Sequence, residues 1–401
     1  MKIHKECSKS MVELASFPSV NVKNVALDII RNFKLTRDVA EKNEVVLYPF
    51  SLYPIHYNPK MRSKKWYAIQ QKILGKDKFK LGGKVTGFHY HYTLPKGVFD
   101  KKAKFLKPML NSKIKQTLID SYNLGIAIDP ILIAMLQSSP FLDGKYIAKD
   151  SRVLIYRGGR ALDYDGMYTG YTQYGGLPPY KQTLTDLIYS LKSRHDRMKR
   201  LLEKQGIPAS DISRYGKILD FCWGPVRINK LGTLEQRSSD MNYMELIFAM
   251  SVLMKYSHKQ VHQEFMRVIP SEVGLEEPFK VEGNTLIVPP HTHVRKHLQY
   301  HSAYTGLENK DVHNYCTRFF KFAKQYASPK YDNLLKSIQT MLDEKKTTSD
   351  SMLAYVKKKG YNPKDRDEKI PDEVLREMCL DFSERGSKHL DKTEELVKEM
   401  G

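Results

Sequence analysis

Two stretches of the chain place ionisable side chains two residues apart in segments that are typical of β-strands. His89 and His91 alternate with aromatic residues in GFHYHYTLP, and Glu235 and Arg237 alternate in GTLEQR. Because residues two apart in a strand point to the same side of a sheet, each pair shares one face. Unpaired charge is costly to bury, so such a face must be hydrated or bind ligands. Glu13, within the otherwise apolar run MVELA, repeats the pattern on a third predicted strand.

Each pair taken alone has a simpler interpretation. His89 and His91 could be hydrogen-bonded surface histidines, and Glu235 with Arg237 could form a cross-strand ion pair on an exposed face. Taken together they favour a ligand site, because carboxylates and imidazoles on neighbouring strands suit Mg²⁺ or Mn²⁺ with a nucleotide phosphate.

The elements that must position these residues follow from hydrophobic spacing. Period-two or β-rich patterns predict strands, and apolar residues three and four apart predict helices. The predicted strands are Met11–Ser16, Val45–Ile55, Lys84–Leu94 and a hairpin from Lys217 to Arg237 that turns near Asn229. The predicted helices are Val22–Phe33, Ile114–Met135, Leu184–Leu202, Met244–Met254, a helix ending at Gly360 and another between Pro371 and Gly386.

Three segments carry further signals. The long stretch Ser138–Tyr180 is rich in Gly, Tyr, Asp and Pro, and its part Tyr164–Gly176 is either a lid over a substrate or a surface loop. His293, His297 and His301 would share one face of a helix and could bind a metal, although no carboxylate accompanies them in the sequence. The run from Asn58 to Lys84 has nine Lys or Arg against one acid, which is typical of a solvated face or loop.

Composition limits the function classes. The 401 residues carry a formal net charge of +21, which suits anionic partners such as nucleotides, nucleic acids or carboxylate substrates. There is no uninterrupted apolar run near the roughly 20 residues that span a bilayer, so no membrane partner is expected. The four cysteines are scattered without a Cys-x-x-Cys pair, which predicts a cytoplasmic protein.

Four motifs resemble those of one enzyme family in order and spacing. These are KSMVELASFPSV, GFHYHYTLP, SSPFLDG followed by LIYRGGR, and WGPVRINKLGTLEQRSSD. They look like the successive motifs of the glutamate-cysteine ligase-like carboxylate-amine ligases. The resemblance covers about residues 1–310 and fades beyond them.

The resemblance implies an α+β, glutamine-synthetase-like fold, in which a curved antiparallel sheet forms a funnel and helices pack outside it. It implies a catalytic domain over residues 1–340, followed by a charged helical tail over residues 341–401. The implied reaction uses ATP to phosphorylate an amino-acid carboxylate, typically the γ-carboxyl of glutamate, and an amine such as cysteine then displaces the phosphate. The small-molecule partners would be that amino acid, the amine and Mg-ATP.

The resemblance also implies roles for individual residues. Glu13 and Glu235 would be metal ligands, and His89 or His91 would lie beside the metal or the nucleotide phosphates. Arg237 would face the transferred phosphoryl group. The substrate carboxylate or a phosphate would be held by arginines that follow the Ser-Pro-Phe loop and by one in the histidine-rich segment, namely Arg157, Arg160 and Arg295.

The chain departs from the family pattern at its start. The family begins with a glutamate-bearing strand well before the stretch seen here at Met11, and that strand supplies metal ligands. Glu6 is a candidate replacement. We expect an open sheet edge where that strand would lie, able to recruit a second copy or a complementing chain. Two alternatives follow: a catalytically impaired relative that binds nucleotide or a partner, and, less favoured, a basic nucleic-acid-binding protein that uses Trp66 and Tyr67 of the basic run.

Overall fold

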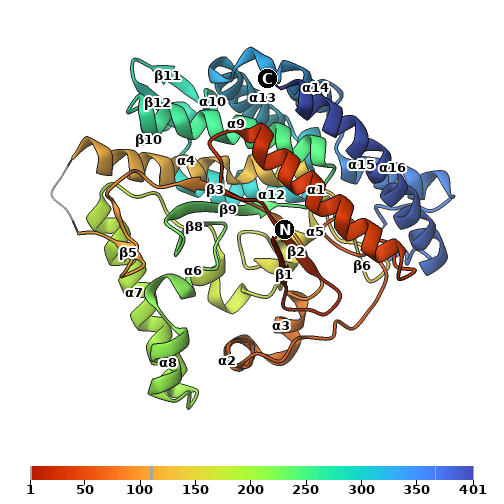
Figure 1. Ribbon diagram of the computed structural model, residues 1–401, viewed down its shortest axis with the longest axis horizontal. Helices are drawn as coiled ribbons and strands as arrows, with labels where there is room; N and C mark the ends of the chain where they lie inside the picture. The colour runs from red at the N-terminus through yellow and green to blue at the C-terminus, as the bar shows by residue number, and fades with distance from the viewer. Residues whose placement is uncertain (1, 109–111, 366, 401) are drawn as a thin grey trace.

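The computed structural model describes residues 2–108, 112–365 and 367–400 of the chain (Figure 1). Helices account for 55% of the structure and strands for 13%, which confirms the expected α+β class. The sheets formed by the described residues have two or three strands each, and none is closed. The helices therefore supply most of the core, and the sheets mainly position side chains.

The central sheet carries the motifs that the sequence singled out. Its order is β3–β9–β8, with both pairs antiparallel, and its strands are β3 (Phe88–Thr93), β9 (Thr233–Ser239) and β8 (Val226–Asn229). The predicted hairpin turn near Asn229 is confirmed, because β8 ends there and β9 pairs with it. The first strand begins at Val226 and not at Lys217, because Ile218–Phe221 forms a 3₁₀ turn. The buried side chains of Val226, Ile228 and Leu234 belong to the main hydrophobic cluster, so one face of the sheet is apolar and the other is free for function.

Two long helices cover the apolar face of this sheet. They are α4 (Lys113–Leu136) and α9 (Met244–Gln263), which pack against each other and against β9 and β3 (Figure 1). By length and composition α4 could cross a bilayer, but its apolar window is buried inside the protein along its whole length. In this fold α4 is the central core helix.

The C-terminal helices pack against this core. They are α13 (Lys310–Tyr326), α14 (Asp332–Glu344), α15 (Thr348–Lys358) and α16 (Asp372–Glu399), with α1 (Val22–Glu41) beside α16 in Figure 1. The prediction of a short helix between Pro371 and Gly386 is wrong in length. Helix α16 continues past Gly386 to Glu399 and has 28 residues in all. Met352, Phe382 and Val397 are buried, so the tail contributes to the hydrophobic core.

A second hydrophobic cluster joins four helices at the bottom of Figure 1. They are α2 (Lys65–Leu74), α3 (Lys76–Leu81), α7 (Leu184–Lys204) and α8 (Ala209–Tyr215). Much of the basic run that was expected to be a solvated face or loop is therefore helical, and Trp66 packs inward against Phe221 and Trp223.

The remaining strands form small separate sheets. A hairpin of β1 (Lys2–Lys5) and β2 (Val12–Ala15) carries Glu13. The predicted strand over Val45–Ile55 is wrong, since only Leu52 makes an isolated bridge, to Val85. The other strands are β4 (Phe99–Asp100), β5 (Phe105–Leu106), β6 (Phe141–Leu142), β7 (Lys145–Tyr146), β10 (Arg267–Pro270), β11 (Lys280–Glu282) and β12 (Thr285–Val288), of which β10 and β12 pair in parallel.

Candidate active site

Glu235 occupies the middle of the polar face of the central sheet. In the register, His91 of β3 lies directly opposite it on one side and Arg227 of β8 on the other. Its side chain is only 2% exposed. The antiparallel pairing therefore concentrates charged and polar groups from all three strands around one buried carboxylate.

Guanidinium and amide donors surround this carboxylate. Arg227 donates from Nε to Oε2 at 2.6 Å and from Nη2 to Oε1 at 3.1 Å, and Arg237 donates from Nη1 to Oε1 at 2.6 Å. Asn229 donates a further hydrogen bond to Oε2. A carboxylate has about four lone-pair positions, so these four bonds fill them. We call Glu235, Arg227, Arg237, Asn229, His89 and His91 the Glu235 cluster.

The charges in the Glu235 cluster set its protonation. Burial raises the pKa of Glu235, but the positive charges of Arg237 and Arg227 outweigh burial and hold the pKa well below its ordinary value. Burial lowers the pKa of Arg237, and the Glu235 carboxylate reverses this and raises the pKa above its ordinary value. Glu235 is therefore ionised, and two guanidiniums around one carboxylate leave one positive charge that can attract phosphate.

Both histidines of the cluster are neutral near pH 7. His89 Nδ1 lies 3.5 Å from Glu235 Oε1 and 3.4 Å from Arg237 Nη1, and His91 Nδ1 lies 2.9 Å from the Thr233 hydroxyl. Burial lowers the pKa of each, and the Arg237 charge lowers the pKa of His89 further. Neutral imidazoles offer a lone pair to a metal or accept a hydrogen bond from a ligand.

Glu13 approaches this face from the β1–β2 hairpin, where it pairs with His4. Partial burial raises its pKa, and the negative charges of Glu6 and Glu235 raise it further, whereas Arg237 lowers it. Glu13 makes no hydrogen bond or ion pair with another described residue, and Glu6 accepts one bond from the Cys7 amide. Mutually repelling carboxylates of this kind are relieved by a divalent cation.

These donors can be tested against a Mg²⁺ ion. Glu13 and Glu6 fit, because they offer free carboxylate oxygens close enough to repel each other. Glu235 offers a free lone pair only if Arg227 or Asn229 turns away from it. Its role as a metal ligand stays a prediction.

Arg152, from helix α5 (Ser151–Tyr156), supports the backbone of the cluster, and no sequence pattern predicted this role. Its guanidinium donates to the carbonyl oxygens of Ser238 at 3.2 Å and Arg237 at 3.1 Å. A Cβ on Gly87 would lie 2.1 Å from Arg152 Nη2, so glycine at this position lets the guanidinium pass beside β3. Arg152 therefore fixes the backbone that carries Arg237.

A second network lies on the opposite side of β9. Arg157 donates to both oxygens of Asp129, at 2.8 and 2.9 Å, and to the Ser238 hydroxyl at 2.9 Å. Gln299 and Ser238 also donate to Asp129. Asp129 is fully buried, so Arg157 balances its charge.

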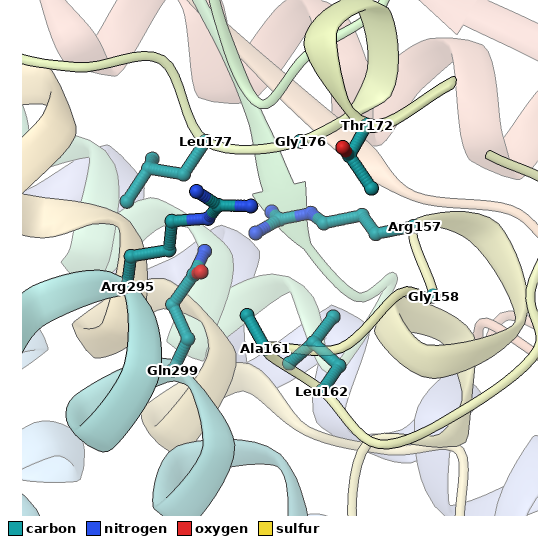
Figure 2. A pocket seen from close by; sticks show the side chains of 9 residues that line it. All are labelled: Arg157, Gly158, Ala161, Leu162, Thr172, Gly176, Leu177, Arg295 and Gln299. Atoms are coloured by element: carbon teal, nitrogen blue, oxygen red, sulfur yellow. The ribbon is translucent and has the colours of Figure 1, made fainter. Parts of the chain in front are cut away.

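A small hollow with a free volume of about 20 Å³ opens beside this network. Figure 2 shows that Arg157 and Arg295 point their guanidinium groups toward each other across it, with Gln299 beneath them. Three of the five N–H donors of Arg157 serve Asp129 and Ser238, which leaves two for a ligand. We call this hollow the Arg157 pocket. Arg160, in contrast, is exposed and makes no hydrogen bond or ion pair with a described residue.

Arg295 reaches the pocket from a turn of π-helix, Val294–Leu298, between α11 (His291–His293) and α12 (Gln299–Tyr304). The rings of His293, His297 and His301 follow one another along this helix, with centroids 4.7 and 4.5 Å apart. A carboxylate does accompany them, because His297 Nε2 lies 2.8 Å from Asp311. Among the described residues, however, no group of three or more His, Cys, Asp or Glu is arranged to hold a metal.

The segment Tyr164–Gly176 forms one wall of the Arg157 pocket through Thr172 and Gly176. Tyr168 is buried and stacks on Trp223 with ring centroids 5.5 Å apart. Aromatic packing thus fixes part of the segment, and its movement as a lid stays a prediction.

No model of a known protein family matches the chain, and neither does any curated protein. The functional assignment therefore depends on the residues and their geometry.

Proposed function

We propose that the protein is an ATP- and Mg²⁺-dependent carboxylate-amine ligase on a glutamine-synthetase-like fold. The observation that carries the proposal is the Glu235 cluster. His89, His91, Glu235 and Arg237 come from motifs far apart in the sequence, yet they lie on one sheet face, with Glu13 near enough for its pKa to respond to Arg237 and Glu235. This arrangement suits phosphoryl transfer, where catalysis depends on position and charge.

The proposed reaction has two steps. A carboxylate oxygen of the amino acid attacks the γ-phosphorus of ATP, and ADP leaves. The amine nitrogen then attacks the acyl carbon, phosphate leaves, and the nitrogen loses a proton. Mg²⁺, when bound at Glu13 and Glu6, would supply positive charge to the phosphate oxygens.

The residues of the chain would divide this work. Arg237 and Arg227 would hold the phosphoryl oxygens, because their combined charge exceeds that of Glu235. Neutral His89 would accept a hydrogen bond from a ligand at the same face. The buried tyrosines behind Thr172 would help to keep water from the reactive acyl phosphate.

The charge of the Arg157 pocket supports an amino-acid substrate. The pocket's free volume of about 20 Å³ is far below the roughly 300–1,000 Å³ of usual ligand pockets. A substrate would therefore enter only after the Tyr164–Gly176 segment that lines the pocket moves. Asp129 balances Arg157, whereas Arg295 forms no ion pair with a described residue and so adds a net positive charge. A small carboxylate such as glutamate fits this charge.

The test is ADP release by the purified chain with Mg-ATP, glutamate and a panel of amines that includes cysteine. The proposal expects release that depends on both the amino acid and an amine. Glu235→Gln should lower it by about 100-fold or more, whereas Glu282→Gln, at an exposed glutamate of β11, should leave it unchanged. Equal activity of the two variants would remove Glu235 from the site.

One observation favours a second candidate, a relative that binds nucleotide without catalysis. All four lone-pair positions of Glu235 are filled by Arg227, Arg237 and Asn229, which leaves the cluster positively charged without a metal. Such a protein would bind ATP in the presence of EDTA at this face and release no ADP with any amine. Assembly with a second or complementing chain and a cytoplasmic location also stay proposals.

A further inference from the structure

The segment Tyr164–Gly176, which forms one wall of the Arg157 pocket, also has an outer side. Thr172, Gly176 and Leu177 line the pocket, whereas Tyr171, Gln173 and Tyr174 line a separate hollow of about 320 Å³ against α7. The segment consists of a 3₁₀ turn, Thr169–Tyr171, and the short helix α6 (Thr172–Gly175). We call the outer hollow the α6–α7 groove.

Three cations of α7 line the far side of the groove. Arg197, Arg200 and Lys204 follow one another at spacings of three and four residues, so they share one face of the helix. All three are exposed, and none forms an ion pair with a described residue. Like charges at this spacing repel one another, so an anion bound between them would be favoured.

Aromatic rings form the near side. Tyr171 is half-buried, and Tyr174 is buried with its ring centroid 6.4 Å from that of Tyr171 and 6.1 Å from that of Trp223. A planar base can stack on a tyrosine held in this way, with a contribution of about 1–3 kcal/mol. The groove therefore combines a flat aromatic wall with unpaired cations.

We infer that the α6–α7 groove is a binding site for a nucleoside polyphosphate, separate from the nucleotide at the Glu235 cluster. The phosphates would contact Arg197, Arg200 and Lys204, and the base would lie against Tyr171. Its volume of about 320 Å³ is at the low end of the roughly 300–1,000 Å³ range of small-molecule pockets. This inference goes beyond the proposed ligase activity and does not depend on it.

The setting of the groove supports an anionic ligand. The α2–α3 region, which shares the second hydrophobic cluster with α7, lies within the run of nine cations and one acid over residues 58–84, and five of these cations form no ion pair with a described residue. A field of one sign raises the local concentration of anions and speeds their binding. A bound ligand would also restrain the segment whose inner side contacts the Arg157 pocket, so occupancy could change affinity there.

The experiment is calorimetric titration of the full chain with ATP, tripolyphosphate and adenosine in EDTA, which prevents metal-dependent binding at Glu13. Arg197→Gln with Arg200→Gln should weaken ATP binding by about 100-fold, since each charge-assisted contact contributes about tenfold. The matched control, Lys192→Gln with Lys199→Gln on the same helix, removes the same charge away from the groove and should change affinity by less than about 3-fold.

Tyr171→Leu tests the aromatic wall. It should weaken ATP binding by about 5-fold or more and leave tripolyphosphate binding unchanged. Trp66 and Trp223 are the two tryptophans of the chain and both belong to the adjoining cluster, so ATP should also change tryptophan fluorescence.

Four outcomes would overturn the assignment. The first is that ATP does not bind in EDTA, and the second is that the two double variants lose ATP affinity equally. The third is that tripolyphosphate binds as tightly as ATP to both wild type and Tyr171→Leu. The fourth is that a single-stranded oligonucleotide binds more than about tenfold tighter than ATP and displaces it. The last would assign the groove to nucleic acid. An absence of ADP release would refute the ligase proposal alone and leave this result intact.

Discussion

Arginine side chains have opposite roles in the Glu235 cluster and in the α6–α7 groove. In the cluster, two arginines meet one buried carboxylate at 2.6 Å, and the strand register fixes all three. In the groove, two arginines and a lysine stand exposed with no acidic partner among the described residues. The first set of charges is satisfied by the fold, and the second is available to a ligand.

This difference has an energetic consequence. A buried charge that loses its partner destabilises the fold strongly, because desolvation is no longer compensated. An exposed charge keeps its hydration, so its removal costs the fold little. Substitutions in the buried networks should therefore lower the free energy of unfolding, and substitutions in the groove should change only ligand affinity.

The largest effect is expected at Asp129, the most buried carboxylate of the paired networks. Asp129→Asn keeps the shape but leaves Arg157 without its counter-charge, so the free energy of unfolding should fall by about 3–5 kcal/mol. Urea denaturation measures this change. Asp77→Asn, at an exposed residue, is the control and should stay within about 0.5 kcal/mol of wild type. A loss below about 1 kcal/mol at Asp129 would mean that Arg157 is hydrated after all.

The next effect is expected at Glu235, and it depends on pH. Because the folded pKa of Glu235 lies below its unfolded value of about 4.3, the ionised carboxylate stabilises the fold above that pH, and this contribution is lost as the pH falls through and below it. At pH 7, Glu235→Gln should cost about 2–3 kcal/mol. Urea denaturation at several pH values measures the difference in free energy of unfolding between variant and wild type. This difference should become smaller below about pH 4. A difference that did not change with pH would mean that the shape of the Glu235 side chain, and not its charge, stabilises the fold.

Strand alternation was enough to predict the face that holds the Glu235 cluster. Period-two spacing holds in any strand, and it was the signal that identified His89, His91, Glu235 and Arg237. Arg227 and Asn229 alternate in the same way in β8, and the hairpin register brings them to Glu235, so the same signal could have identified them.

Other parts could not be predicted from local pattern. Arg152 and Asp129 lie on helices within apolar sequence, and only tertiary contacts bring them to β9. The predicted strand over Val45–Ile55 includes Pro49 and Pro54, which lack the N–H that a sheet ladder requires. The three unpaired cations of α7 resemble any solvated helix face until the tyrosines across the groove are seen.

A smaller effect should follow from Gly87→Ala, which tests how firmly Arg152 supports the cluster. The new methyl group would lie 2.1 Å from Arg152 Nη2, and the guanidinium can yield only by giving up its bonds to the Arg237 and Ser238 carbonyls. We expect a loss of about 1–2 kcal/mol in urea denaturation. Gly97→Ala is not a suitable control because Gly97 has a positive φ of 90°. Gly170→Ala is suitable, since a Cβ there meets nothing within 4 Å.

The smallest effect on stability is expected from Arg197→Gln with Arg200→Gln in the groove. Both side chains are exposed and unpaired with described residues, so the free energy of unfolding should change by no more than about 0.5 kcal/mol, and relief of the repulsion with Lys204 could make the change favourable. Urea denaturation without nucleotide provides the measurement. The same denaturation with ATP should stabilise wild type and not the double variant, because a ligand that binds only the folded state adds to its stability. If the double variant lost more than about 2 kcal/mol without ATP, these arginines would be structural, and the contrast with the Glu235 cluster would fail.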